Sequence, residues 1–317
     1  MNRRISWVLP GSLGVLVACA GGSEVRIAPA EVGDSTAPLT PDQAKVLAAA
    51  EKLYRAEDAE FVARRDELAR DPVLARWLTR LFARDAVVAF DRRQASDADF
   101  LRQAAGQDPL WDRALDQLRA MGGAAAPCLI EDFLRHPRHD RRRLGVTLLG
   151  VAGEGALPAM KDVLASPDPA MRRLAVMAVG EMSATPATTA ELLRAAGDRE
   201  FTLRAAAYEG LANAGPPAAP HLRRALTDEA DGYVRRVIAR ALAGDPSKVT
   251  ATALVQYMRR CLDEGDRAGF DVAHEALSRL AGTNPRRPRG HEAWARWAAE
   301  QPERWEIGHG AVEDRSR

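Results

Sequence analysis

Apolar residues recur with helical spacing along most of the chain, and from residue 107 this pattern itself repeats about every 31 residues. Each repeat contains an apolar stretch with an arginine at a fixed place, followed by a second apolar stretch. The arginines lie 30, 32 and 31 residues apart, at Arg142, Arg172, Arg204 and Arg235. The second stretches open at residues spaced 31 apart, which are Pro127, Pro158, Thr189 and Pro220. Because a proline in the first turn of a helix loses no hydrogen bond, the pattern predicts two-helix units that stack into a solenoid over residues 107–282.

Further helical patterns precede the repeats. Thr40-Pro41 combines a capping residue with a first-turn proline, and an apolar stripe of seven-residue spacing follows. The stripe consists of Leu47, Tyr54, Phe61 and Leu68. Asp71-Pro72 repeats the start signal for a second helix, and Ser96 is a candidate cap for a short third one. We expect residues 40–106 to form an antiparallel helical cap on the repeats.

The end of the chain carries a different signal. Residues 283–306 contain Trp294, Trp297 and Trp305, and the first two share one helix face. Each tryptophan can bury roughly 150–250 Å², so this segment is expected to be a cap helix that seals the open end of the stack. An aromatic platform for a sugar or a peptide is the alternative. Residues 307–317 are charged and contain glycine, and they are expected to be a disordered tail.

The composition supports an all-α fold. Ala, Leu and Arg, which rank high in helix propensity, dominate the sequence, and aromatic residues make up only 5%. The formal net charge of +1 offers no overall attraction to nucleic acid or to an anionic membrane. Cys128 and Cys261 lie in apolar helical patterns, so buried free thiols are favoured over a disulfide.

The first residues combine Arg3 and Arg4 with a short apolar run that ends at Cys19. A basic start, an apolar stretch and small residues at its exit are typical of a secretory signal, here residues 1–18. The run is too short to span a bilayer as a helix. A plain signal peptide with an incidental cysteine, or a buried apolar segment, are the alternatives. Residues 19–39 are rich in Gly, Ala, Pro, Ser and Thr and are expected to be a flexible tether.

The tetrapeptide Leu16-Val17-Ala18-Cys19 resembles the lipobox of bacterial lipoproteins. The resemblance implies that Cys19 is acylated, for example with palmitate, and becomes the first mature residue. It also implies export and anchoring in the bacterial cell envelope. Ala20 and Gly21 follow the cysteine, with no Asp for inner-membrane retention, so the expected location is the outer membrane facing the periplasm.

The segments Met171–Ala175, Leu203–Ala207 and Val234–Ile238 resemble HEAT repeats in the short bacterial form that is known from phycobilisome-lyase HEAT-like proteins. The resemblance implies an Asp–Arg ladder between successive units. The residues it would assign to this structural ladder are Asp168, Arg172, Glu200, Arg204, Asp231 and Arg235. Each acid precedes its arginine by four residues, a spacing at which the two side chains can meet. Arg142 belongs to the first unit, where Arg138 stands in place of the acid.

The sequence shows no catalytic motif of the hydrolase, P-loop or zincin type. His136, His139 and Asp140 form a local cluster, but the surrounding arginines disfavour a metal ion, and loop polarity explains the histidines. We therefore expect no catalytic residue, no cofactor and no metal.

The second helices of such a stack line its binding face. Charged candidates on them run from acidic to basic in chain order: Glu131, Asp132, Lys161, Asp162, Glu191, Arg194, Arg223, Arg224, Arg259 and Arg260. This gradient either orients a polar protein partner or is a solvated face. The favoured function is a membrane-tethered, monomeric, non-catalytic scaffold that binds other envelope proteins and no nucleic acid. The alternatives are a HEAT-like lyase or hydrolase that uses the concave groove, and a carbohydrate- or peptidoglycan-binding module.

Overall fold

The computed structural model describes residues 39–95, 108–284, 286 and 289–306. Within these ranges the chain forms helices and connecting turns, with one isolated β-bridge between Ser247 and Arg304. The expected signal peptide, most of the tether, the short helix after Ser96 and the C-terminal tail lie outside the described residues. No helix in the described part is long and apolar enough to cross a membrane.

The helices alternate between two roles along the chain. The elements that precede the first complete unit are α1 Pro41–Arg55, α2 Glu60–Leu68, α3 Pro72–Ala95 and α5 Pro109–Met121. The first helices of the units are α7 His139–Ala152, α9 Pro169–Glu181, α11 Phe201–Asn213, α13 Gly232–Leu242 and α15 Arg267–Leu280. The second helices are α6 Ala126–Leu129 with a π-turn Ile130–Leu134, α8 Leu157–Leu164, α10 Pro186–Ala195, α12 Ala219–Asp228, α14 Lys248–Glu264 and α16 His291–Glu300.

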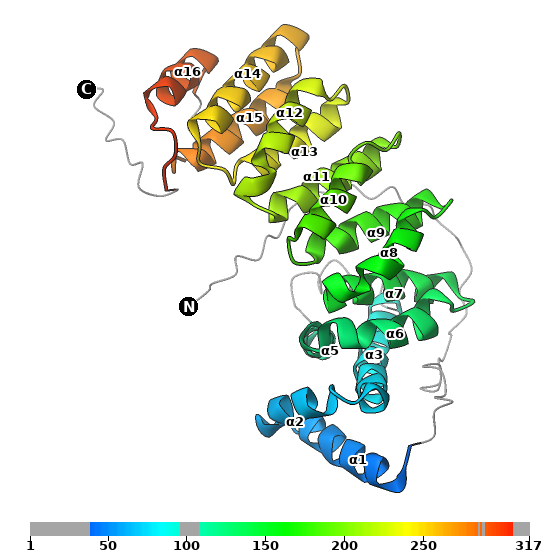
Figure 1. Cartoon of the computed structure of the whole chain (residues 1–317). Helices are drawn as coiled ribbons and strands as arrows, with labels where there is room; N and C mark the ends of the chain where they lie inside the picture. Colours follow the sequence, from blue (N-terminus) through cyan, green and yellow to red (C-terminus); the bar gives the residue numbers. More distant parts are fainter. Residues whose placement is uncertain (1–38, 96–107, 285, 287–288, 307–317) are drawn as a thin grey trace.

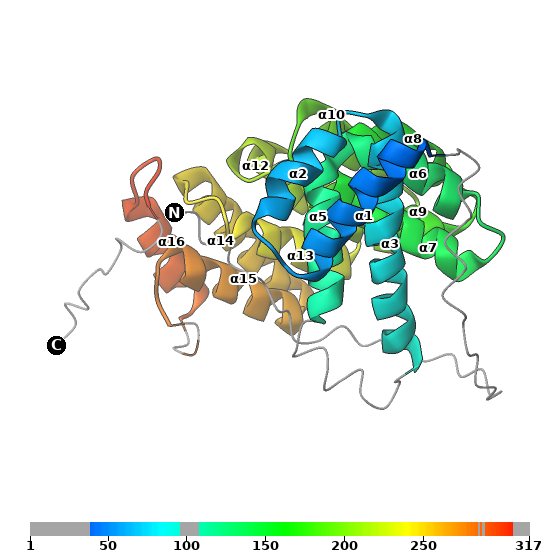
Figure 2. The same cartoon turned by 90° about the horizontal axis from the view of Figure 1, so that it is seen from below.

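These helices form a curved, two-layered stack (Figure 1). Consecutive first helices pack side by side from α7 to α15, and α3 and α5 extend this layer toward the N-terminus. The second helices make the other layer. In Figure 2, most of them lie in the upper part of the picture and the first helices lie in the lower part. The structure is therefore an all-α solenoid of two-helix units, as the repeat pattern predicts.

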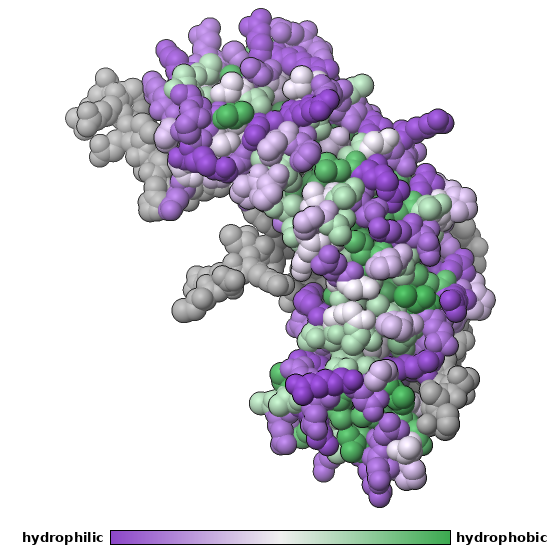
Figure 3. All heavy atoms as spheres, in the orientation of Figure 1, coloured by the Kyte–Doolittle hydropathy of each residue, from purple (hydrophilic) through white to green (hydrophobic). Residues whose placement is uncertain are grey.

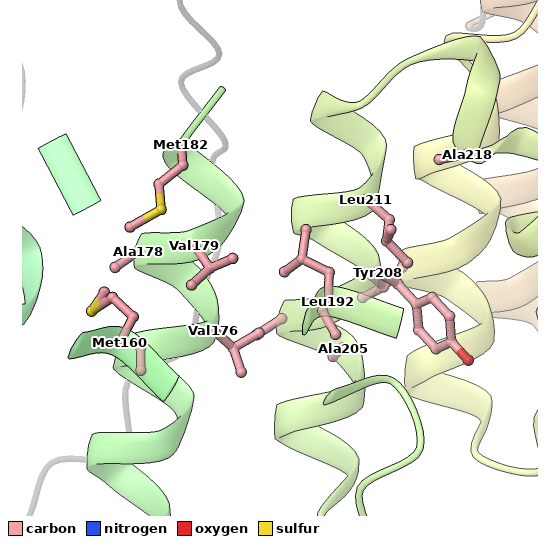
Figure 4. Close-up of a cluster of buried hydrophobic side chains, with 14 of the residues drawn as sticks. Met160, Val176, Ala178, Val179, Met182, Leu192, Ala205, Tyr208, Leu211 and Ala218 are labelled. Carbon is pink, nitrogen blue, oxygen red and sulfur yellow. The ribbon is translucent and has the colours of Figure 1, made fainter. Parts of the chain in front are cut away.

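The core lies between the layers and continues from unit to unit. Figure 4 shows the contact of α9 with α10 and α11, where Val176, Val179, Leu192 and Leu211 are all at most 4% exposed. The first helices approach closely because glycines face each other. A methyl group at Gly180 of α9 would lie 2.7 Å from the Cα of Gly210 in α11. Small residues thus let each unit bury its apolar face against the next.

The N-terminal segment differs from expectation in one respect. The seven-residue stripe from Leu47 to Leu68 indicates one continuous helix, but the chain breaks after Arg55, and Glu57 adopts a positive φ of 55°. The break lets Tyr54 of α1 and Phe61 of α2 both contact Phe82 of α3, with ring centroids 5.1 and 6.0 Å away. Tertiary packing on α3 therefore overrides the local helical pattern.

Two ion pairs, each with a buried arginine, attach α3 to the repeats. Arg80 donates through two nitrogens to Asp132 at 2.7 and 2.9 Å, and both side chains are less than 10% exposed. Arg141 of α7 donates in the same bidentate way to Asp91, at 2.9 and 2.8 Å. Such pairs demand good geometry because each charge must be desolvated. They hold α3 in one register against α6 and α7.

The C-terminal tryptophans are part of the core. Trp294 is fully buried and Trp297 is 9% exposed, and their rings pack edge to face with centroids 5.4 Å apart. Trp294 Nε1 donates to His274 Nδ1 at 2.9 Å, and Trp305 Nε1 donates to the carbonyl of Leu280 at 2.9 Å. The cluster packs against the last unit, so the buried Trp294 and Trp297 are not available as a platform for a sugar or a peptide, whereas Trp305 is partly buried.

The cysteines of the folded part have no disulfide partner. Cys128 and Cys261 are both buried and free. Burial raises the pKa of the Cys128 thiol to about 12, and the neighbouring Asp132 adds to this effect. The prediction of buried free thiols is confirmed.

Candidate interaction surface

The arginine of each central unit connects two units. Arg204 donates from Nε and Nη2 to the two carboxylate oxygens of Glu229, both at 2.9 Å, and from Nη1 to the carbonyls of Asp198 and Arg199. Arg235 donates from Nη1 and Nη2 to the two carboxylate oxygens of Glu264, at 3.4 and 2.7 Å. These contacts clamp the connection before the first helix and tie it to the next unit.

The acids that pair with these arginines are not the ones expected from the i, i+4 spacing. Asp168 and Asp231 are instead the N-caps of α9 and α13, where they accept backbone N–H groups of the first turn. Glu200 stands at the N-cap position of α11 and accepts a hydrogen bond from Thr202. At the start of a helix the Asp168 and Asp231 carboxylates bind the free N–H groups, and this capping role replaces the pairing within the unit. The Glu200 side chain makes no such capping bond.

The true partners lie two residues before each N-cap. Asp198 and Glu229 accept the backbone N–H of Glu200 and Asp231, respectively, and Glu264 holds the same place before Asp266. Asp198 and Glu229 are 31 residues apart, as the repeat requires. This second acidic series was the signal in the sequence for the ladder between units.

The rungs differ in strength. Burial alone would raise the pKa of Glu229, but the hydrogen bond and charge of Arg204, together with the backbone N–H of Asp231, outweigh it and hold the pKa below its usual range. The Asp198 carboxylate, shorter by one methylene, lies 3.9 Å from Arg172 Nε. Arg172 is otherwise held by the carbonyls of Ser166 and Pro167 at 2.9 and 3.2 Å. The Arg172–Asp198 rung is therefore the loosest of the three.

The first unit has no such acid. Arg142 donates to the carbonyls of His136 and Pro137, and the ring nitrogen Nδ1 of His136 accepts the backbone N–H of Arg138. His139 lies 3.3 Å from Asp168 of the next unit. Asp140 pairs with Arg138 at 2.8 Å. The two histidines and Asp140 therefore have separate partners, and no group of metal-binding side chains occurs among the described residues.

The charged residues expected on the second-helix face are partly used within the stack. Glu191 is 12% exposed, because Lys161 of the preceding unit and Arg194 of its own helix both bind it. Arg223 binds Asp245 at 2.9 Å, and that carboxylate is 5% exposed. Glu131 and Asp132 bind α3 through Arg76 and Arg80.

Other members of the predicted set remain on the surface. Asp162 is exposed on α8, and Arg224 is 86% exposed beside Asp228. Arg259 pairs with Asp263, and Arg260 with Glu264, one helical turn later. Figure 3 shows this face, where hydrophilic side chains border a discontinuous band of more apolar surface. The predicted acidic-to-basic gradient is thus largely balanced by local ion pairs.

An additional feature was missed in the sequence. The connections from each second helix to the next first helix lie along one edge of the stack, which we call the loop edge. Phe201, the first residue of α11, and Tyr233, the second residue of α13, lie there and are 42% and 44% exposed. Their ring centroids are 6.1 Å apart and the ring planes meet at 88°. Next to them is an open depression lined by Arg172, Gly197, Asp198, Arg199 and Glu200. Neither aromatic occupies a recurrent position of the repeat, so no periodic signal marked them.

Comparison with known proteins agrees with this geometry. The profile of the HEAT repeats family matches residues 157–243, from the first residue of α8 to the end of α13. The stack is thus a HEAT-like α-solenoid. No curated protein matches the chain.

Among solved structures, the complex of CpcE and CpcF of phycocyanin lyase from a Nostoc species is similar to this chain. The identity is 22%, the TM-score is 0.34, and the alignment covers 47% of this chain and 98% of that one.

Proposed function

We propose that this protein is a lipid-anchored scaffold of the bacterial cell envelope, which binds other envelope proteins through its helical stack and has no catalytic activity. The observation that carries the proposal is a stack closed at both ends but open along its sides. The N-terminal aromatic cluster and the C-terminal tryptophans bury the terminal apolar faces. The lateral surface is left for contacts with other molecules.

The anchoring part of the proposal rests on the sequence around Cys19. The tetrapeptide that ends at Cys19 fits a lipidation signal, and residues 20–38 provide a spacer between that cysteine and α1. The proposal includes the absence of catalysis because the depression beside Gly197 is polar and open to solvent. A lyase or hydrolase site would need an enclosed apolar pocket with convergent polar groups.

Two measurements test the proposal. Cys19→Ser is expected to abolish acylation, so that the protein leaves the membrane fraction and the intact mass lacks the lipid; Cys128→Ser serves as the matched control. Unchanged fractionation and mass would refute the anchor.

Crosslinking in intact cells, with photoreactive residues at Arg224 and Arg259 on the second helices, tests the scaffold. Reproducible adducts with one or a few envelope proteins are expected. If no position on the stack yields a specific adduct, the scaffold role is wrong.

A further inference from the structure

The loop edge around α11 and α13 carries two large aromatic side chains that the fold does not require. At the matching places of α9 stand Pro169 and Ala170, and that unit packs equally well. Phe201 and Tyr233 contact each other edge to face, yet each keeps more than 40% of its surface in solvent. Stacking of the units is therefore not the reason for these side chains, and their exposed ring faces are open to a further group.

Carboxylates surround the aromatic pair. Glu200 precedes Phe201, Asp231 lies two residues before Tyr233, and neither makes an ion pair within 4.0 Å among the described residues. Arg204 already binds Glu229 with both outer nitrogens, and Asp231 lies close enough to contribute to the raised pKa of that guanidinium. The Arg204 guanidinium thus lies near two carboxylates, those of Glu229 and Asp231, and its single positive charge does not balance both. A net negative charge therefore remains beside the Phe201 and Tyr233 rings.

Exposed aromatic faces next to uncompensated carboxylates favour a cation. A guanidinium or ammonium group gains from the ring quadrupole and from the carboxylates at the same time. Arg199 lines the depression and opposes this attraction, but it is a single charge beside Glu200 and Asp231. Arg235 and Arg236 also reach the surroundings of Gly232, where they bind Glu264 and Asp266. Arg172, also at the depression, is occupied by two backbone carbonyls and by Asp198.

We propose that the Phe201–Tyr233 pair, together with Glu200 and Asp231, receives an arginine or lysine side chain from an extended segment of a partner protein. The inference rests on the proposed scaffold function and specifies the chemistry of one partner. The segment runs along the loop edge, and its basic side chain lies against the aromatic rings. The depression at Gly197 accommodates the neighbouring part of the segment.

The test uses the purified full chain in detergent and three fluorescent twelve-residue Gly–Ser peptides. They carry arginine, glutamine or glutamate at every third position, and binding is followed by anisotropy. The arginine peptide is expected to bind at least tenfold more tightly than the glutamine peptide, and the glutamate peptide more weakly still. The double variant Phe201→Ala/Tyr233→Ala and the double variant Glu200→Gln/Asp231→Asn are each expected to reduce arginine-peptide binding about tenfold.

The matched control is Val249→Ala/Leu262→Ala, which removes two exposed apolar side chains from α14 and is expected to leave binding unchanged. Circular dichroism verifies the fold of each variant, and Asn at 231 retains an N-cap. Equal binding of all three peptides, preference for the glutamate peptide through Arg199, or full binding by the aromatic variant would each overturn the inference. If one of these outcomes occurs but crosslinking in cells still gives specific adducts at Arg224 or Arg259, this inference is wrong and the proposed scaffold function is still supported.

Discussion

Arg204 holds Glu229, in the connection that leads to the next unit, through two hydrogen bonds of 2.9 Å each. The same guanidinium binds two carbonyls of the connection before its own helix. One side chain therefore fixes both the entry into α11 and the distance to the following unit. Since Glu229 is only 7% exposed, its charge depends on this partner.

Loss of that partner is expected to destabilise the stack. Arg204→Ala leaves a buried carboxylate without compensation and is expected to lower the free energy of unfolding by about 3 kcal/mol. Arg224→Ala is the control, because Arg224 is 86% exposed beside an exposed acid, and a change within about 0.5 kcal/mol is expected. Urea denaturation followed by circular dichroism measures both. Equal midpoints for the two variants would contradict a bridging role for Arg204.

The same rung predicts a dependence on pH. The pKa of Glu229 lies below its usual range in the folded chain, so the folded state binds a proton less readily than the unfolded state. The stabilisation is complete above the unfolded pKa of about 4.3 and is lost as the pH falls through the lower folded value. Glu229→Gln is expected to be less stable at pH 7 and to lose less stability than the wild type between about pH 5 and pH 3. Parallel pH profiles for the two proteins would argue against this linkage.

The glycine pair between α9 and α11 allows a sharp test of packing. Gly180→Ala places a methyl group 2.7 Å from the Cα of Gly210, where only movement of the helices can relieve the clash. The expected cost is about 1–3 kcal/mol. Gly290→Ala is the control, because a methyl group there meets nothing within 4 Å and the backbone has a negative φ of −71°. Thermal unfolding of both variants decides the point; an unchanged transition for Gly180→Ala would mean that the helices do not approach this closely.

The thiols of the folded part are expected to be inert. Cys128 is buried, and its pKa of about 12 leaves almost no thiolate at pH 8. Cys261 is also buried, and burial raises its pKa. Neither thiol is expected to react with a disulfide reagent in the native chain within an hour, and both react after denaturation in guanidinium. Rapid labelling of the native protein, located by mass spectrometry to Cys128, would show that α6 opens.

Much of the architecture was readable from local patterns. The arginine and proline series, together with helix starts such as Thr40-Pro41 and Asp71-Pro72, predicted the two-helix units and the first helices. The same reasoning joined α1 and α2 into one helix, because the seven-residue spacing is preserved across the break. Only the position of Phe82 on α3 explains why the chain turns there.

The ladder illustrates a second limit. An acid four residues before an arginine suggests a pair on one helix, yet Asp168 and Asp231 stand at N-caps, where the free backbone N–H groups compete for the carboxylate. The arginines instead reach acids at the end of their own second helix or in the connection that leads to the next unit. Spacing alone does not reveal which of two nearby acids an arginine selects.

The sequence by itself determined the helical character, the period of the stack and the presence of apolar capping segments before and after the repeats. These properties follow from periodicity and helix propensity within short segments. The tertiary structure decided which charged side chains pair between units, that Trp294 and Trp297 are buried, and that Phe201 and Tyr233 meet on the loop edge. These outcomes depend on the distance and rotation between stacked helices. Close contacts such as that of Gly180 with Gly210 set this geometry, and no single segment encodes it.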